Sequence, residues 1–429
     1  MPPRQVLFSV LILFGINILN FYDRHLSGAL VEPMRKEFAL SDTNVGLMGS
    51  AFIWIYALIG VPLGLVADRW SRKKLLLAGL LVWTAMTAMG GLANGFLFLL
   101  VTRIGVGIGE AVCAPVGTSW IGDLFPAERR GRVLALFMLG VPVGGALSYF
   151  FSGPIAQAFG WRTAMVVAAL PVVVLAPALW ILREPERGES EGGHAGGAAG
   201  SVWTILRRPT LWWIIASGVF LNFNMYAVST FLPALLSRVH GMTLGASGKA
   251  TGAMYLLGGT CGGLAAGYLS DRIVRRRQDG RLILAALLAA LGAPLAYVGV
   301  MQPVGSTWQA LALLTGAYAC MNTYYGLVYA SIQDIVLPTQ RGITMAIYFM
   351  AMYLCGASFG PLLTGMASDF MARRAMAAAG AVQMTELFKA HGLQQAMLLI
   401  PALLLALAFV LFGASRTFSN DAVRRQGAA

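Results

Sequence analysis

The stretch Arg103-Ile-Gly-Val-Gly-Ile-Gly-Glu110 lies inside an apolar segment that is long enough to cross a membrane. Its cation and its anion are seven residues apart, which is two helical turns, so both lie on one helix face. The three glycines that alternate between them allow neighbouring helices to approach closely on more than one side. Ionised groups at membrane depth are costly unless they face a partner or a wet cavity. The pair therefore predicts a functional site within a bundle of membrane helices.

The composition of the chain is that of a membrane protein. Of its 429 residues, 58% are hydrophobic and 11% are charged, whereas a soluble globular domain carries about 25% charged residues. The apolar stretches are continuous rather than alternating, which argues against a β-barrel. Since a spanning helix needs about 20 apolar residues, the length allows about twelve spans. We therefore expect an all-α polytopic membrane protein with twelve transmembrane helices, and the hydropathy excludes a soluble enzyme.

Apolar runs bounded by charges, Pro or Gly predict these helices in two groups of six. We expect an N-terminal six-helix bundle in 1–182, a cytoplasmic linker in 183–208 and a C-terminal six-helix bundle in 209–429. The linker is charged and Gly-rich, which is typical of a flexible connection. The predicted helices cover 6–31, 44–67, 74–93, 96–122, 130–152, 161–182, 209–237, 245–270, 281–301, 308–336, 341–368 and 393–415.

The excess of basic residues indicates an orientation rather than a nucleic-acid partner. The formal net charge is +13, and Lys and Arg gather in the loops that face inside if the N-terminus is cytoplasmic. The outside loops near 94 and 304 hold none, and the longest outside segment, about 370–392, is the exception. The positive-inside rule predicts that both termini lie in the cytoplasm. We expect a monomer that is integral to the cytoplasmic (inner) membrane and binds no nucleic acid.

Cofactor or enzyme chemistry is not indicated. The four cysteines lie within apolar segments and show no paired spacing, which is typical of small packing residues. The four histidines are scattered, and neither a nucleophile–base pair nor a ligand spacing for a metal is recognisable. We expect no cofactor, no metal site and no enzymatic activity.

A local motif repeats in the two groups of helices. The second helix ends in Gly64-Leu-Val-Ala-Asp-Arg-Trp-Ser-Arg-Lys-Lys74, and the eighth ends in Gly267-Tyr-Leu-Ser-Asp-Arg-Ile-Val-Arg-Arg-Arg277. Internal repeats of this kind are how many transporters are built. The basic residues alone fit a simple positive-inside anchor, but the repeated Gly and Asp favour a cytoplasmic latch between the two bundles. The predicted latch residues are Gly64, Asp68, Arg69, Arg72, Lys73, Gly267, Asp271 and Arg272.

With these features the chain resembles the major facilitator superfamily, and within it the spinster branch and its bacterial relatives. The stretches that carry the second resemblance include Asn20-Phe-Tyr-Asp-Arg24, Arg103–Glu110 and Gly356-Ala-Ser-Phe-Gly-Pro361. The resemblance implies the major facilitator fold and a proton-linked carrier of amphipathic lipids, such as lysophospholipids or sphingoid-type molecules. Organic-anion symporters with a similar first helix and drug or metabolite exporters of the same superfamily are alternatives. A non-transporting membrane sensor is a more remote one.

Two acidic residues, Asp23 and Glu110, lie well inside apolar spans. Burial favours the protonated form of a carboxyl group, and a nearby guanidinium favours its ionised form. A carboxylate between these two effects can bind and release a proton near neutral pH. Glu110 shares a helix face with Arg103, and the fold implied by the resemblance brings Asp23 close to both. We predict proton coupling by Asp23, Glu110 and Arg103, and the alternative interpretation is a structural ion pair.

Polar and aromatic residues in the first, seventh and tenth helices are candidates for a substrate cavity. Rings at such positions also serve simple packing, so each is a weak candidate on its own. As a group they fit a small amphipathic or anionic substrate, with rings for its tail and Asn and Arg for its head, and we expect protons and membrane lipid as the other partners. The candidates are Asn20, Tyr22, Arg24, Asn222, Asn224, Tyr226, Asn322, Tyr324 and Tyr325.

Overall fold

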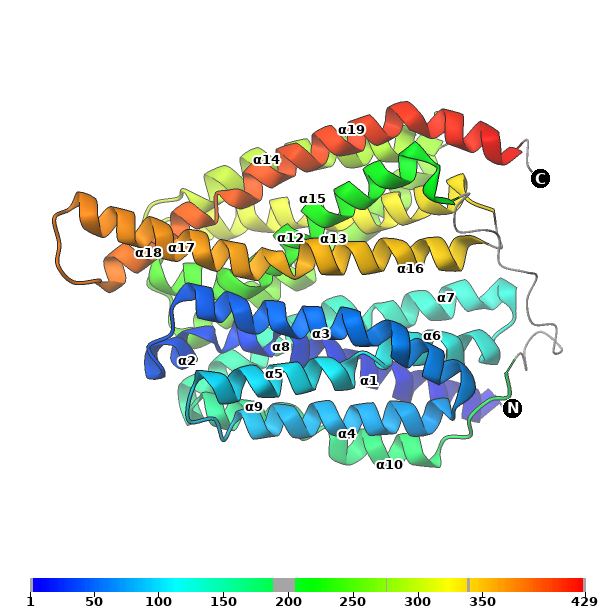
Figure 1. The fold of residues 1–429 in the computed structure, drawn as a ribbon, viewed down its shortest axis with the longest axis horizontal. Helices are drawn as coiled ribbons and strands as arrows, with labels where there is room; N and C mark the ends of the chain where they lie inside the picture. The colour runs from blue at the N-terminus through cyan, green and yellow to red at the C-terminus, as the bar shows by residue number, and fades with distance from the viewer. Residues whose placement is uncertain (1–2, 188–204, 275, 338–339, 427–429) are drawn as a thin grey trace. The chain divides into compact units, whose positions relative to one another are not determined.

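The computed structural model describes residues 3–187, 205–274, 276–337 and 340–426, and every regular element in these ranges is helical (Figure 1). The elements of the first half are α1 (Pro3–Ala29), α2 (Val31–Glu37), α3 (Asp42–Arg69), α4 (Arg72–Gly90), α5 (Phe96–Glu110), α6 (Cys113–Leu124), α7 (Ala127–Met138), α8 (Gly140–Phe159), α9 (Trp161–Ala169) and α10 (Val172–Ile181). Those of the second half are α12 (Pro209–Arg238), α13 (Leu244–Val274), α14 (Gly280–Val300), α15 (Thr307–Ile335), α16 (Arg341–Met352), the π-helical turn η3 (Tyr353–Ala357), α17 (Phe359–Ala378), α18 (Glu386–Ala396) and α19 (Leu399–Gln426).

The all-α prediction is confirmed, and each predicted span corresponds to one helix or to a run of consecutive helices. Among the described residues, nine candidate spans are long and apolar enough to cross a membrane. One of them, Phe96–Leu124, combines α5 with α6, and another, Trp161–Ile181, combines α9 with α10. Pro171 precedes α10, and because proline lacks an N–H and clashes with the preceding turn, it interrupts the helix there.

Two segments differ from the sequence prediction. The eleventh predicted helix ended at 368, but α17 continues to Ala378 and α18 begins at Glu386, so most of the expected 370–392 loop is helical. The extension is rich in alanine and methionine, which are strong helix formers. The second difference is α2, a short helix that follows α1 where a loop was expected.

Helix boundaries follow local chemistry at two places. The Ser71 side chain accepts a hydrogen bond from the backbone N–H of Lys74 at the start of α4, which is a standard N-cap. Gly160, between α8 and α9, has φ of 87°, a conformation that glycine adopts without steric cost. The chain can therefore reverse between these two helices.

The described residues fall into two compact units. Unit 1 comprises those within 1–40, 47–196 and 243–252, and unit 2 those within 41–46, 197–242 and 253–429. The start of α3 thus belongs to unit 2, and the start of α13 belongs to unit 1. Residues 188–204 of the predicted linker lie outside the described residues, and the division at 183–208 stays a prediction.

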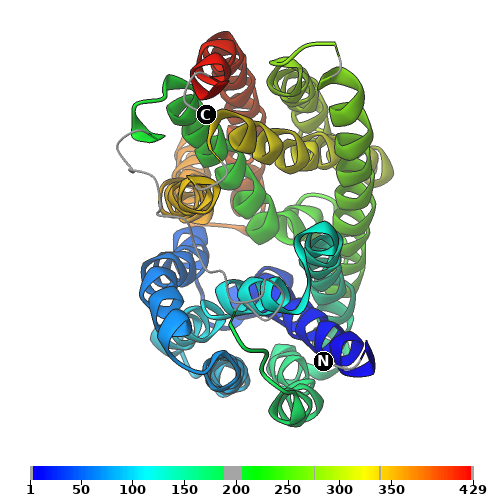
Figure 2. The ribbon, with the colours of Figure 1, turned by 90° about the vertical axis from the view of Figure 1, so that its right-hand side faces the viewer.

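Unit 1 is built around α1, which packs along α8, and α4, which packs along α5. Figure 2 shows the helices nearly end-on, with α1 in dark blue. The polar site described below lies on α1, α4 and α5. One buried apolar cluster of this unit comprises Leu26, Leu30, Met34, Met48, Ala93, Leu99, Ala156, Trp161, Ala164, Met165 and Ala168.

Unit 2 contains a buried ion pair at the start of α3. Both carboxylate oxygens of Asp42 accept from Arg238, at 2.8 and 2.9 Å, and Ser368 donates to Asp42 at 2.6 Å. Asp369 accepts from the backbone N–H groups of Asp42 and Thr43, at 3.0 and 2.8 Å. It therefore satisfies two donors of the first turn of α3, which have no partner within their own helix.

Asp42→Ala is expected to destabilise the protein by about 3–5 kcal/mol, because it removes the bidentate partner of a buried guanidinium. The measurement is the thermal unfolding midpoint in detergent. The double variant Asp42→Leu/Arg238→Met, which removes both charges, is expected to recover most of the loss. An unchanged midpoint for Asp42→Ala would show that the pair contributes little.

Candidate functional site

The alternating glycines of α5 allow helices on two sides to approach closely, as the sequence predicts. A Cβ on Gly109 would lie 2.6 Å from the backbone nitrogen of Trp83 in α4. A Cβ on Gly107 would lie 2.8 Å from the backbone oxygen of Phe52 in α3. These contacts leave no room for a side chain, so α5 holds its two charged residues at fixed distances from α3 and α4.

Glu110, the last residue of α5, forms an ion pair with Arg24 of α1. Its Oε2 accepts from Nε of Arg24 at 3.3 Å and from Nη2 at 3.2 Å. The pair is enclosed, since the exposed fractions of the two side chains are 3% for Arg24 and 0% for Glu110. The guanidinium that Glu110 contacts is therefore that of Arg24 rather than that of Arg103, the partner suggested by the shared helix face. The cation in contact with Glu110 thus comes from another helix, α1, and not from α5 itself.

The guanidinium of Arg24 also lies against three aromatic rings. Its central carbon is 4.7 Å from the ring centroid of Phe21, 5.4 Å from that of Phe52 and 4.4 Å from that of Tyr56. Cation–π attraction adds to the ion pair, and most strongly at sites without water. Sequence reasoning missed this aromatic cage, because its members come from two helices and no spacing along the chain links Phe21 of α1 to Phe52 and Tyr56 of α3.

Asp23 lies in a second polar cluster within unit 1. Its two carboxylate oxygens are 2.8 and 2.7 Å from the hydroxyl oxygen of Thr87 in α4. Arg103 approaches the same hydroxyl at 3.4 Å through Nη2, and it donates to Ser27 at 3.2 Å through Nη1. Asp23 is fully buried and Arg103 nearly so. The prediction named Asp23 and Arg103, but it missed Thr87 and Ser27.

The three residues predicted for proton coupling thus occur in one unit, each with a partner of opposite charge or a hydroxyl group nearby. Two buried polar atoms of these residues, Oε1 of Glu110 and Nε of Arg103, have no hydrogen-bond partner among the described residues. A buried carboxylate oxygen without a partner is costly. The site can therefore accommodate a change in the protonation of Glu110 without breaking a hydrogen bond at that atom.

The other cavity candidates of unit 1 lie beside this site. Asn20 is buried, and the hydroxyl of Tyr22 lies 2.7 Å from that of Ser152 in α8. The His25 ring contacts the backbone oxygen of Phe21 at 2.8 Å. A role in a substrate cavity stays a prediction for Asn20, Tyr22 and Arg24.

The candidates of unit 2 divide into accessible and packed residues. Tyr226, Asn322 and Tyr325 are half-buried, and Tyr325 donates to Asn222 at 3.4 Å. Asn224 is fully buried and donates to the backbone of Ile400 in α19. The remaining candidates are also packed: Asn222 donates to Gly218 of its own helix, and the hydroxyl of Tyr324 lies 2.7 Å from that of Ser217. Asn224 thus joins α12 to α19, and Tyr324 joins α15 to α12.

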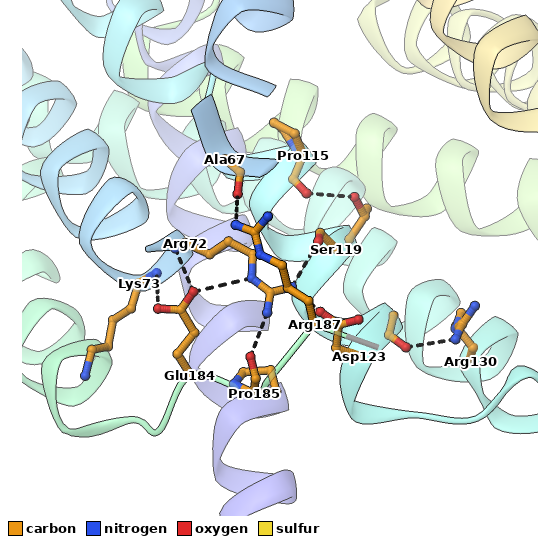
Figure 3. A network of polar contacts seen from close by, with 12 residues as sticks. Ala67, Arg72, Lys73, Pro115, Ser119, Asp123, Arg130, Glu184, Pro185 and Arg187 are labelled. Carbon is orange, nitrogen blue, oxygen red and sulfur yellow. Dashed lines mark hydrogen bonds and ion pairs between the residues drawn. The ribbon is translucent and has the colours of Figure 1, made fainter. Parts of the chain in front are cut away.

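The predicted latch residues Arg72 and Lys73 lie in a dense polar network (Figure 3). The guanidinium of Arg72 is buried against Asp123 of α6, Ser119 of the same helix and Glu184. The ammonium of Lys73 donates to the backbone oxygens of residues 180 and 182. Among the described residues these partners all belong to unit 1, so Arg72 and Lys73 stabilise one unit from within. A latch between the two bundles stays a prediction.

Glu184 provides the anionic partner for the start of α4. Burial raises its pKa, but the hydrogen bonds from the Ser71 hydroxyl and from the backbone of Arg72 and Lys73 outweigh burial and hold the pKa below the ordinary value. Glu184 is therefore ionised at neutral pH. Its negative charge lies at the N-terminus of α4, where the helix dipole favours an anion.

The remaining latch residues are exposed or outside the described part of the structure. Arg69 is exposed, and Arg272 donates to Tyr268 of its own helix at 2.7 Å. Among the described residues, a Cβ on Gly64 or on Gly267 would meet nothing within 4 Å. The side chains of Asp68 and Asp271 lie outside the described residues.

Unit 2 contains an ion pair that is equivalent to the Arg72–Asp123 pair of unit 1. Its arginine is not one of the residues that the repeated motif predicted. Arg281, at the start of α14, pairs with Asp334 near the end of α15 and donates to Ser270 at 2.8 Å. In unit 1, Arg72 at the start of α4 pairs with Asp123 near the end of α6. The signal that could have identified Arg281 is its place at the start of a helix, rather than its offset from the repeated Gly and Asp.

An all-helical chain with internal repeats and buried acid–base pairs inside apolar helices has the architecture of a membrane transporter. Residues 13–361 match the Major Facilitator Superfamily, and the chain belongs to this superfamily. The predicted fold class and family are thereby confirmed.

Individual relatives are similar over most of the chain. An MFS-type efflux pump of Mycolicibacterium smegmatis is 32% identical over 373 residues, which are 86% of this chain and 85% of that protein. Protein spinster of Drosophila melanogaster is 25% identical over 377 residues, which are 85% of this chain and 62% of that protein. The crystal structure of a bacterial homologue to the human lysosomal transporter spinster, in an inward-facing and unoccupied conformation, matches with a TM-score of 0.87. It is 27% identical, and the match covers 98% of this chain and 99% of that chain. The predicted resemblance to spinster proteins is confirmed.

Proposed function

We propose that this protein is a proton-coupled secondary active transporter that works by alternating access and carries an amphipathic lipid-like substrate. The observation that supports proton coupling best is the pair of fully buried carboxylates, Asp23 and Glu110, each close to a guanidinium or hydroxyl partner within unit 1. Buried ionisable groups at membrane depth mark proton or substrate pathways.

In the proposed cycle a proton reaches Glu110 and neutralises it. The ion pair with Arg24 then loses its Coulomb attraction, and the guanidinium becomes available to an anionic headgroup. Deprotonation of Glu110 restores the pair and displaces the headgroup. The aromatic rings around Arg24 provide apolar contact next to that charge. This combination suits a molecule with an anionic head and an apolar body, in keeping with the similarity to spinster proteins.

Export of a drug or metabolite is the second candidate function. It is favoured by the similarity to the Mycolicibacterium smegmatis efflux pump. For both functions we propose a monomer in the cytoplasmic membrane with both termini in the cytoplasm. Basic residues gather at the end of α3 and the start of α4 and again in the first turns of α7, and they support that orientation.

The test uses purified protein in proteoliposomes, with fluorescent lysophosphatidylethanolamine as the lipid probe and ethidium as the drug probe. A lipid carrier is expected to accumulate the lipid probe when a pH gradient is imposed, and a protonophore is expected to abolish accumulation. Movement of ethidium alone would favour the exporter. Movement of neither probe under any gradient would argue against both functions.

A further inference from the structure

Thr87 differs from the other threonines of its surroundings in the direction of its hydrogen bond. A threonine in an apolar helix ordinarily donates to a carbonyl of the preceding turn. Thr84, one turn earlier in α4, does so to Leu80 at 2.7 Å, and Thr118 does so to Ala114 at 2.8 Å. The Thr87 hydroxyl is directed instead to another helix, where it meets the carboxylate of Asp23.

The position of this hydroxyl fixes the direction of its hydrogen bonds. It is nearly equidistant from the two oxygens of Asp23, at 2.8 and 2.7 Å, and Arg103 lies on its other side at 3.4 Å. A hydroxyl has one proton to donate and two lone pairs to accept with. When Asp23 is ionised, Arg103 donates to Thr87 and Thr87 donates to Asp23, so that the hydroxyl links the cation to the anion.

We propose that Thr87 is a positioning residue that sets how readily Asp23 takes up its proton, a role that rests on the proposed proton coupling. Its hydroxyl stabilises the ionised carboxylate through a charge-assisted hydrogen bond, which is stronger than a neutral one. When Asp23 is protonated, the same hydroxyl rotates and accepts the new O–H. Thr87 thus serves both states but favours the ionised one.

The charged groups around Asp23 come from two helices. Arg103 of α5 interacts with it favourably, whereas Glu110 of α5 and Tyr22 of α1 interact with it unfavourably when ionised. Arg24 offsets the charge of Glu110. A change at Thr87 leaves all four of these groups in place. Its effect on the protonation of Asp23 therefore reports the loss of the hydroxyl, with its contacts to both Asp23 and Arg103.

The experiment compares three substitutions in proteoliposomes. Thr87→Val keeps the shape of the side chain and removes the hydroxyl, Thr87→Ser keeps the hydroxyl, and Thr84→Val removes a hydroxyl that donates only within α4. The measurement is the pH dependence of uptake of fluorescent lysophosphatidylethanolamine. Thr87→Val is expected to shift the midpoint to higher pH by about one unit, a tenfold change in proton affinity, because a charge-assisted hydrogen bond contributes on that order. Thr87→Ser and Thr84→Val are expected to keep the original midpoint.

A second measurement does not depend on transport. Infrared difference spectra of the purified protein follow the protonated carboxyl band as pH changes, and the Asp23→Asn variant identifies the contribution of Asp23. That band is expected to titrate at higher pH in Thr87→Val, with Thr87→Ala as a second hydroxyl-free variant. An unshifted Asp23 band in both variants would overturn the role of Thr87. A shifted band in a protein whose uptake ignores pH would support Thr87 and refute proton coupling, so the two failures are distinguishable.

Discussion

Glu110→Gln is expected to abolish the pH-driven accumulation of substrate while leaving the protein folded. Glutamine has the shape of glutamate, and its side-chain oxygen can still accept from Arg24, but it carries no exchangeable acid proton. The ion pair becomes a weaker neutral hydrogen bond, and the guanidinium no longer responds to pH. Accumulation in proteoliposomes should fall to the level of protein-free liposomes, whereas the thermal unfolding midpoint should change little.

Exchange of labelled for unlabelled substrate at equal pH is the informative second measurement, because it needs no net movement of protons. We expect Glu110→Gln to retain it. Glu37→Gln is the matched control, since Glu37 is also paired with an arginine, Arg162, at 2.7 Å. Hydrogen bonds from Arg162 and Trp161 hold the pKa of Glu37 below its usual value, so it stays ionised and is expected to have no part in coupling. If Glu110→Gln showed normal pH-driven accumulation, the Arg24–Glu110 ion pair would have a structural role and no role in proton coupling.

The fold could be predicted from the sequence because its signals are local. Each spanning helix is a continuous apolar run, and the repeated Gly64 and Gly267 motifs show the internal symmetry. The glycines of the Arg103–Glu110 stretch even indicated where helices approach closely. The loop predicted at 370–392 was wrong because alanine-rich sequence without strong apolar character was interpreted as a connection, whereas helix propensity extends α17.

The charged members of the candidate site were predictable, but its hydroxyl and aromatic members and its pairings were not. A charged residue in an apolar run is visible from the sequence, so Asp23, Arg103 and Glu110 were found. Which cation faces Glu110 depends on the rotation of α1 against α5, and a single sequence does not contain that rotation. Thr87 was missed for the same reason. In the sequence, a threonine whose hydroxyl donates to another helix cannot be distinguished from one whose hydroxyl donates to a carbonyl of its own helix.

The repeated glycines lead to the second prediction with a large effect. Near the start of α3, a Cβ on Gly46 would lie 2.3 Å from a backbone oxygen of Pro361, so no side chain fits there. Near its end, a Cβ on Gly64 would meet no atom of the described residues within 4 Å. The pattern recurs in α13, where a Cβ on Gly248 would lie 2.6 Å from a backbone oxygen and one on Gly267 would lie in open space.

A helical glycine whose Cβ position is unoccupied lowers the stability of this conformation, because glycine within a helix is less stable than alanine by about 0.5–1 kcal/mol. Within the alternating-access cycle proposed above, we infer that Gly64 and Gly267 are needed in the other state, where a neighbouring helix packs against them. Gly64→Leu should then fit the present structure and keep or raise the thermal unfolding midpoint, yet reduce uptake of the lipid probe at least tenfold. The midpoint and the initial rate of uptake, measured on the same purified protein, provide the two readouts.

Side-chain size distinguishes this explanation from a loss of local flexibility. Gly64→Ala removes the conformational freedom of glycine but adds only a methyl group, so it should retain most of the uptake. Gly267→Leu should reproduce the loss at the equivalent position of the repeat. Full uptake in both leucine variants would mean that neither glycine is a packing surface in any state of the cycle. Equal losses with alanine and leucine would mean that flexibility at these positions is what transport requires.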